Sequence, residues 1–119
     1  MNEIIKKFNN ISIDFLTQTA PITGYTYLYK FKMLTNINSI YAIDKFIDNV
    51  LPYKNKIIAQ DESFFMNKQV ESSYMNDVIG LKQIYYTLDN SSKKNMWDII
   101  LALTYLAEER YNNSPLYSY

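Results

Sequence analysis

Apolar residues recur every three or four positions along most of the chain, which is the spacing of amphipathic helices. The first such segment runs from Glu3 to Thr19. We expect it to end before Pro21, because a proline disfavours the helical conformation of the residue before it, here Ala20. A turn over 21–24 follows, in which Gly24 makes the connection flexible.

The stretch 25–35 fits two patterns. Large aromatic or apolar residues alternate with other residues as in a strand, at Tyr25, Tyr27, Tyr29, Phe31 and Met33. Tyr27, Leu28, Phe31 and Leu34 instead form a helical stripe. We predict a helix, because a single strand would find no partner in this chain for its backbone hydrogen bonds.

Four further helices are predicted downstream. Asn38 or Ser39 can cap a helix whose stripe extends from Ile40 to Leu51. Pro52 suits the first turn of the next helix, which frays near residue 61. A polar interval over 67–73 precedes a helix over 74–88 that Gly80 weakens, and a turn with several candidate caps over 89–92 precedes a helix over 93–111.

This pattern predicts an all-α fold, a compact single-domain bundle of five or six helices. The C-terminal helix is the least polar segment and should be central, with Trp97 in the core. Residues 1–111 would form the domain and residues 112–119 a flexible tail. No apolar run approaches the length of a membrane span or a signal peptide, so we expect an intracellular, soluble protein that does not contact membranes.

Composition removes most catalytic chemistry. The 119 residues include no Cys and no His, which excludes disulfides, thiolate zinc sites, imidazole ligands and serine triads. Two isolated glycines cannot build a phosphate-binding loop. We therefore expect a protein that is not an enzyme and needs no cofactor.

Two carboxylates are the best candidates for a metal site. Asp44 and Asp48 lie four positions apart on one predicted helix face, with Asp61 and Glu62 as further oxygen donors. Lys45 lies close by, and exposed helix carboxylates usually face water. A metal enzyme is accordingly only a third hypothesis.

Nucleic-acid binding is the second hypothesis, because lysine and tyrosine side chains are abundant and can contact phosphates and bases. However, 12 basic residues balance 12 acidic ones, and the lysines are scattered among the acids. No continuous basic stripe of the kind expected for such an interface is visible. Lysine accounts for every basic residue except Arg110, a bias that AT-rich codons explain better than folding does.

The aromatic residues indicate association with protein. Twelve Tyr, six Phe and one Trp exceed the needs of a small core, and tyrosine is favoured in contact surfaces. Tyr25, Tyr29 and Met33 lie opposite the predicted buried stripe of their helix. Either that helix is fully buried, or these residues form a face for self-association or for a partner.

Two segments resemble small helical proteins encoded by nucleocytoplasmic large DNA viruses, including the giant viruses of amoebae. They are FIDNVLPYKNKIIAQDESFF and GLKQIYYTLDNSSKKNMWDIILALTYL, and the resemblance covers residues 46–107. Its features are the Pro52-Tyr53 corner, the run from Asp61 to Phe65, the LKxIY motif and the Ser-Lys cap before Trp97. In the family pattern a longer apolar run follows the tryptophan, whereas Glu108, Glu109 and Arg110 end the helix here. The resemblance implies a viral accessory or virion protein of the host cytoplasm or virion, with no established activity.

Asp61 and Glu62 have two readings within that resemblance. They could form an edge that recognises another protein, or they could stay solvated while Phe64 and Phe65 anchor the segment to the core. We favour the second reading, because aromatic residues beside short loops commonly act as packing anchors. The leading functional hypothesis is thus a non-enzymatic viral structural or accessory protein that binds a protein partner or itself as a homo-oligomer.

Overall fold

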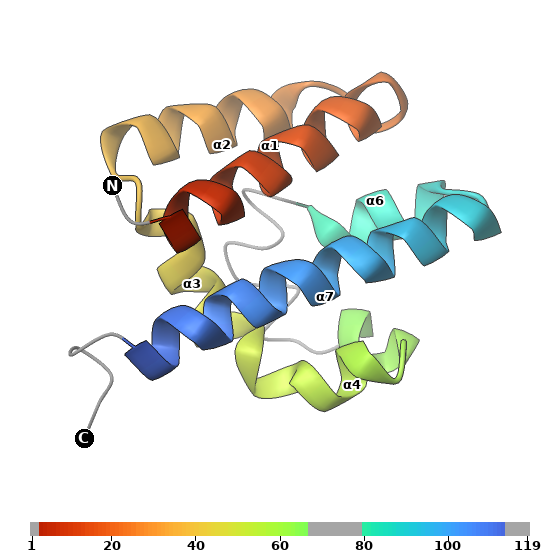
Figure 1. The fold of residues 1–119 in the computed structure, drawn as a ribbon. Helices are drawn as coiled ribbons and strands as arrows, with labels where there is room; N and C mark the ends of the chain where they lie inside the picture. Colours follow the sequence, from red (N-terminus) through yellow and green to blue (C-terminus); the bar gives the residue numbers. More distant parts are fainter. Residues whose placement is uncertain (1–2, 67–79, 114–119) are drawn as a thin grey trace.

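The computed structural model describes residues 3–66 and 80–113, and over these residues the all-α prediction is confirmed (Figure 1). The α-helices are Glu3–Thr23 (α1), Thr26–Ile37 (α2), Tyr41–Asn49 (α3), Lys54–Ile58 (α4), Leu81–Thr87 (α6) and Asn90–Asn113 (α7). Two short 3-10 helices, Leu51–Tyr53 (η1) and Glu62–Met66 (η2), flank α4.

Helix α7 is the central element, as predicted, but the prediction that it is the least polar segment is wrong, because α1, α2 and α3 are each more apolar on average. It packs against α1, α3 and α4, and in Figure 1 it runs between the α1–α2 hairpin and α4. Trp97 is 4% exposed and lies in the core, as predicted. Phe8 of α1 and Phe46 of α3 meet edge to face with their ring centroids 5.2 Å apart, which joins these two helices within the same core.

The predicted end of the first helix is wrong, because α1 continues through Pro21 to Thr23. A proline near the end of a helix removes only one backbone hydrogen bond, and burial of Ala20 against the core holds the last turn in place. The helix ends instead at Gly24, which has a φ of 94° and donates its N–H to the Ala20 carbonyl at 2.7 Å. This is the glycine C-cap arrangement, in which the absence of a Cβ permits a positive φ.

The choice of helix over strand for 25–35 is confirmed by α2. Leu28 and Phe31 are buried at 5% and 0%, while Tyr27 and Leu34 pack partly buried against the core. The alternation of large apolar residues does not reflect a strand. It arises because this helix carries large apolar residues on both of its faces. Only one of those faces turns inward.

The α3 and α4 boundaries follow the predicted signals. The Asn38 side-chain oxygen accepts the Ile40 N–H at 3.3 Å, and Pro52 occupies the start of η1. Helix α4 ends in a Schellman motif, in which Gln60 donates to the Ile57 carbonyl and Asp61 to the Lys56 carbonyl, at 3.0 and 2.9 Å. Gln60 takes the left-handed conformation of this motif, with a φ of 52°.

Gly80 does not lie inside a helix, contrary to the prediction of one continuous helix over 74–88. It has a φ of 64° and precedes α6, which begins at Leu81. The Tyr27 ring lies directly against it, so that a Cβ placed on Gly80 would lie 2.6 Å from Tyr27 Cε1. The polar interval over 67–73 and the part of the predicted helix before residue 80 lie outside the described residues.

Helix α7 is longer than predicted at both ends. Asp89, from the predicted cluster of caps, precedes it and accepts the Ser92 N–H at 2.8 Å. The helix therefore begins at Asn90, three residues before the predicted start at Lys93. At the other end Asn112 and Asn113 are helical, and the predicted tail boundary at residue 112 is two residues early. Residues 114–119 lie outside the described residues.

Candidate protein-interaction surface

The outer side of α2 carries four large apolar side chains at every fourth position. Tyr25, Tyr29, Met33 and Ile37 are 50%, 64%, 55% and 79% exposed, and we call them the α2 outer face. The first three are the residues predicted from sequence, and the alternative of a fully buried helix is wrong for them. Ile37 was missed, although it continues the same four-residue spacing.

The α1–α2 hairpin explains why this face points outward. Helix α2 follows the turn at Gly24 and packs back against α1, which directs Leu28 and Phe31 inward. The Tyr25 carbonyl accepts the Tyr29 N–H at 3.1 Å, which extends the helical register to Tyr25. The rings of Tyr25 and Tyr29 stack 6.0 Å apart at an interplanar angle of 24°, so the face is ordered by a contact of its own.

Asp61 and Glu62 lie on the surface, in a segment of the sequence far from the residues of the α2 outer face. Both carboxylates accept hydrogen bonds from other residues of the chain. Asp61 Oδ1 accepts the Ser63 N–H at 2.9 Å, and this hydrogen bond lowers the pKa of Asp61 below its ordinary value. Glu62 Oε1 accepts the Tyr85 hydroxyl at 2.7 Å. Phe64 and Phe65 are fully buried, so the packing reading of this segment is confirmed for the aromatics. A role of the two carboxylates in recognition stays a prediction.

An aromatic cluster lies beneath Glu62. The Trp97 indole N–H donates to the Tyr85 hydroxyl oxygen at 3.3 Å, and that hydroxyl donates in turn to Glu62. Phe65 stacks on Tyr85 with centroids 4.5 Å apart. Burial, followed by the hydrogen bond to Glu62, raises the pKa of Tyr85 above its ordinary value. The sequence marked Trp97 as core but gave no indication of this chain of hydrogen bonds.

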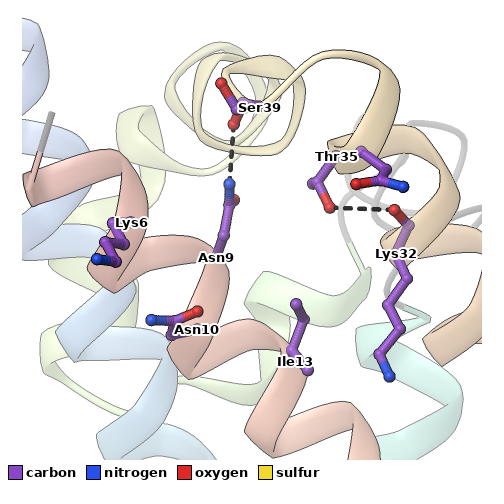
Figure 2. A pocket seen from close by; sticks show the side chains of 8 residues that line it. Lys6, Asn9, Asn10, Ile13, Lys32, Thr35 and Ser39 are labelled. Carbon is purple, nitrogen blue, oxygen red and sulfur yellow. Dashed lines mark hydrogen bonds between the residues drawn. The ribbon is translucent and has the colours of Figure 1, made fainter. Parts of the chain in front are cut away.

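A pocket of about 630 Å³ lies beside the α2 outer face, between α1 and α2 (Figure 2). Its lining residues are Lys6, Asn9, Asn10, Ile13, Lys32, Thr35, Asn36 and Ser39. This pocket could not be predicted from the sequence, because its polar residues come from three separate segments and form no local motif. We refer to it as the α1–α2 pocket.

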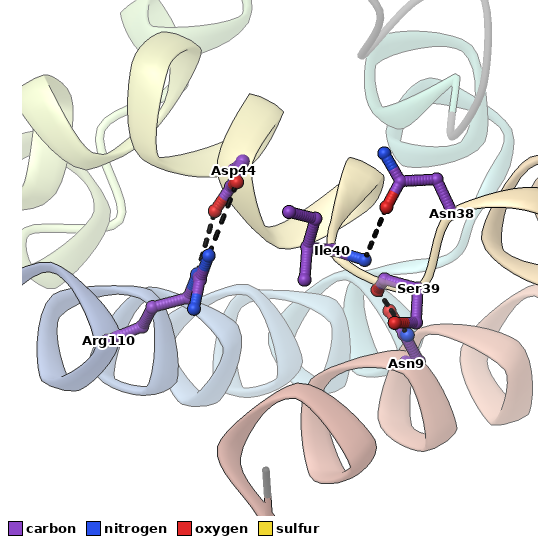
Figure 3. A network of polar contacts seen from close by, with 6 residues as sticks. All are labelled: Asn9, Asn38, Ser39, Ile40, Asp44 and Arg110. Atoms are coloured by element: carbon purple, nitrogen blue, oxygen red, sulfur yellow. Dashed lines mark hydrogen bonds and ion pairs between the residues drawn. The ribbon is translucent and has the colours of Figure 1, made fainter. Parts of the chain in front are cut away.

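The candidate metal ligands are not brought together. Asp44 of α3 binds Arg110 of α7, with Nε to Oδ1 at 2.7 Å and the second nitrogen to Oδ2 at 3.3 Å (Figure 3). Asp48 is exposed on the same helix. Among residues 3–66 and 80–113 no group of three or more carboxylates is placed to hold a metal ion. The single arginine therefore joins two helices through the carboxylate that sequence analysis had considered a ligand.

Comparison with protein-family models, with curated proteins and with solved structures gave no match. The resemblance to viral proteins consequently stays an expectation. Within the described part of the chain, the helices are too short or too polar to cross a membrane. The α2 outer face is the feature from which function can be argued.

Proposed function

We propose that this chain is a non-enzymatic interaction protein that associates with a second copy of itself through the α2 outer face. The observation that carries the proposal is the row of Tyr25, Tyr29, Met33 and Ile37, each at least half exposed. Contiguous exposed apolar surface of this kind marks an interaction site more often than chance placement does. The resemblance and the AT-rich residue bias support a role as an accessory or virion protein of a large DNA virus, in the host cytoplasm or the virion.

The order of residues along the α2 outer face suits an antiparallel two-fold contact. A two-fold axis near Phe31 would pair Tyr25 of one copy with Ile37 of the other, and Tyr29 with Met33. Each aromatic ring would then meet an aliphatic or thioether side chain. Contacts between methionine sulfur and an aromatic ring are favourable, and each contact would occur twice.

The size of the face indicates a weak association. With about 150–250 Å² for a full aromatic side chain, the exposed parts of the four residues amount to roughly 400 Å². Two copies with the stems of flanking residues would bury about 1,000 Å², at the lower limit for a specific interface. We expect a dissociation constant on the order of 0.1 mM.

Electrostatics gives this contact a characteristic salt dependence. Lys30 and Lys32 flank the α2 outer face, and α2 contains no acidic residue. The same two-fold axis would place Lys30 of one copy near Lys32 of the other. Because salt screens like charges, self-association should strengthen as salt rises. An acidic partner would show the opposite dependence.

Sedimentation velocity between 10 µM and 1 mM, at low and high salt, tests the proposal. We expect reversible dimerisation that strengthens with salt, and loss of the dimer in Tyr29→Glu and Met33→Glu. Ile58→Glu is the matched control, since Ile58 is 50% exposed on α4 and outside the face. A parent chain that stays monomeric at 1 mM, or an Ile58→Glu variant that dissociates equally, would contradict the proposal.

A further inference from the structure

Met33 is the one sulfur-containing residue of the α2 outer face, and its side chain is 55% exposed. The chain has no cysteine, so methionine supplies every sulfur atom that an oxidant can reach. Among the described residues Met96 is 1% exposed and therefore shielded, whereas Met66 is 61% exposed on η2, outside the face. The described part of the chain thus presents two accessible thioethers, and one of them lies in the proposed dimer contact.

Met33 lies near the centre of that contact. The two-fold axis near Phe31 pairs Met33 with Tyr29 of the second copy, while Tyr25 and Ile37 form the outer pairs. The centre of an interface is where water is excluded and where a changed side chain costs most affinity. Because each copy contributes one Met33, a change in the polarity of this side chain acts twice on every dimer.

Oxidation of a thioether is such a change in polarity. A sulfur lone pair attacks one oxygen of a peroxide, the S–O bond forms and the O–O bond breaks. The proton of the transferred oxygen passes to the leaving hydroxide, which becomes water. Sulfur loses two electrons and the peroxide gains them. The product carries a strongly polar sulfoxide where the soft apolar sulfur had been, so the favourable contact between sulfur and an aromatic ring is lost.

We propose that Met33 is an oxidation site that controls the α2 outer face, and that its conversion to the sulfoxide by a peroxide releases the dimer. This inference rests on the proposed function, because it concerns the same face. Mass action also requires the reverse effect: dimerisation covers Met33 and slows its oxidation. A methionine sulfoxide reductase restores the thioether with a dithiol, which becomes a disulfide while the oxygen leaves as water, so the release is reversible.

Site-resolved oxidation of the full chain by excess hydrogen peroxide tests the protection. Cleavage after lysine separates Met33 in 33–45 from Met66 in 57–68, so mass spectrometry follows both residues in one sample. With a dissociation constant on the order of 0.1 mM, roughly four fifths of the chains are paired at 1 mM and only a small fraction at 10 µM. We expect the oxidation rate of Met33, relative to that of Met66, to fall at least threefold between these concentrations.

Sedimentation velocity at 1 mM, before and after oxidation, tests the release. The dissociation constant of the dimer should rise at least fivefold once Met33 is fully oxidised, and the reductase should return it to within twofold of its first value. Met66→Leu is the matched control, because it removes the accessible thioether outside the face and should respond to peroxide as the parent does. In Met33→Leu, which keeps the other four methionines, peroxide should change the dissociation constant less than twofold.

Failure of this proposal differs from failure of the proposed function. A parent chain that is monomeric at 1 mM before any oxidation contradicts the dimer and this inference together. A parent that dimerises equally before and after complete oxidation of Met33 overturns only the role of Met33, as does an equal effect of peroxide on Met33→Leu. Loss of helix on oxidation, measured by circular dichroism, would also overturn it, because release would then follow from unfolding.

Discussion

Replacement of Gly80 by alanine is the sharpest test of the packing, because two separate effects act on one methyl group. The φ of 64° at Gly80 belongs to the left-handed region, which costs an L-residue roughly 1–2 kcal/mol. The new Cβ would also lie 2.6 and 2.7 Å from Cε1 and Cε2 of Tyr27. Real Cβ atoms do not approach carbon that closely, so the partly buried ring or the α6 backbone has to move.

The expected loss follows from these two effects. Overpacking of a filled site costs about 1–3 kcal/mol. Replacement of glycine lowers the conformational entropy of the unfolded chain, which returns about 0.4–1 kcal/mol. Gly80→Ala should therefore lower the free energy of unfolding by roughly 2–4 kcal/mol. Gly24→Ala is the matched control, because its φ is also positive and nothing lies within 4 Å of its added Cβ, so its loss should be only about 1 kcal/mol.

Urea unfolding followed by the fluorescence of Trp97, the one tryptophan of the chain, measures both losses. A second pair of variants isolates the contact, since Tyr27→Ala removes the ring that the new methyl group meets. In the Tyr27→Ala background, Gly80→Ala should cost no more than Gly24→Ala costs in the parent. Equal losses for the two glycine variants, or an unchanged loss without the Tyr27 ring, would refute the reasoning.

Three further predictions concern the helix end, the ion pair and the buried hydroxyl. Gln60→Gly should raise the free energy of unfolding by about 0.5–1 kcal/mol in urea unfolding, because glycine relieves the left-handed strain at the end of α4; a lower value would contradict the Schellman geometry. Arg110→Lys should lower it by about 1 kcal/mol, since lysine cannot make the two-point contact with Asp44, and in an Asp44→Ala background the same change should be nearly neutral. The raised pKa of Tyr85 stabilises the fold below the pKa of an unfolded tyrosine, and this stabilisation is lost as pH rises through the folded pKa. Stability measured from pH 8 to 11 should thus fall more steeply for the parent than for Tyr85→Phe, and equal slopes would contradict the shift.

The features that could be predicted from the sequence depend only on residues that are close together in the chain. Spacing of apolar residues predicted each described α-helix but not the 3-10 helix Glu62–Met66. It also predicted that Tyr25, Tyr29 and Met33 share a face, because helical geometry alone relates positions four apart. The same reasoning failed at Pro21 and Gly80. At both positions a residue type with a strong local preference was judged without its tertiary contacts, which are the buried Ala20 in one case and the Tyr27 ring in the other.

The candidate sites differ in the same way. The α2 outer face is visible in the sequence because its residues belong to one helix, and only the choice between burial and exposure needed the structure. The α1–α2 pocket could not be foreseen, because Lys6 and Lys32 lie 26 positions apart and line one pocket only because of the hairpin that Gly24 permits. Asp44 shows the converse. Its spacing from Asp48 suggested a metal ligand, but its carboxylate is bound by Arg110, which lies 66 positions away in the sequence. A surface within one helix can therefore be proposed from sequence. The chemistry of a site between helices cannot, because it depends on which distant residues the fold brings together and which of them bind each other.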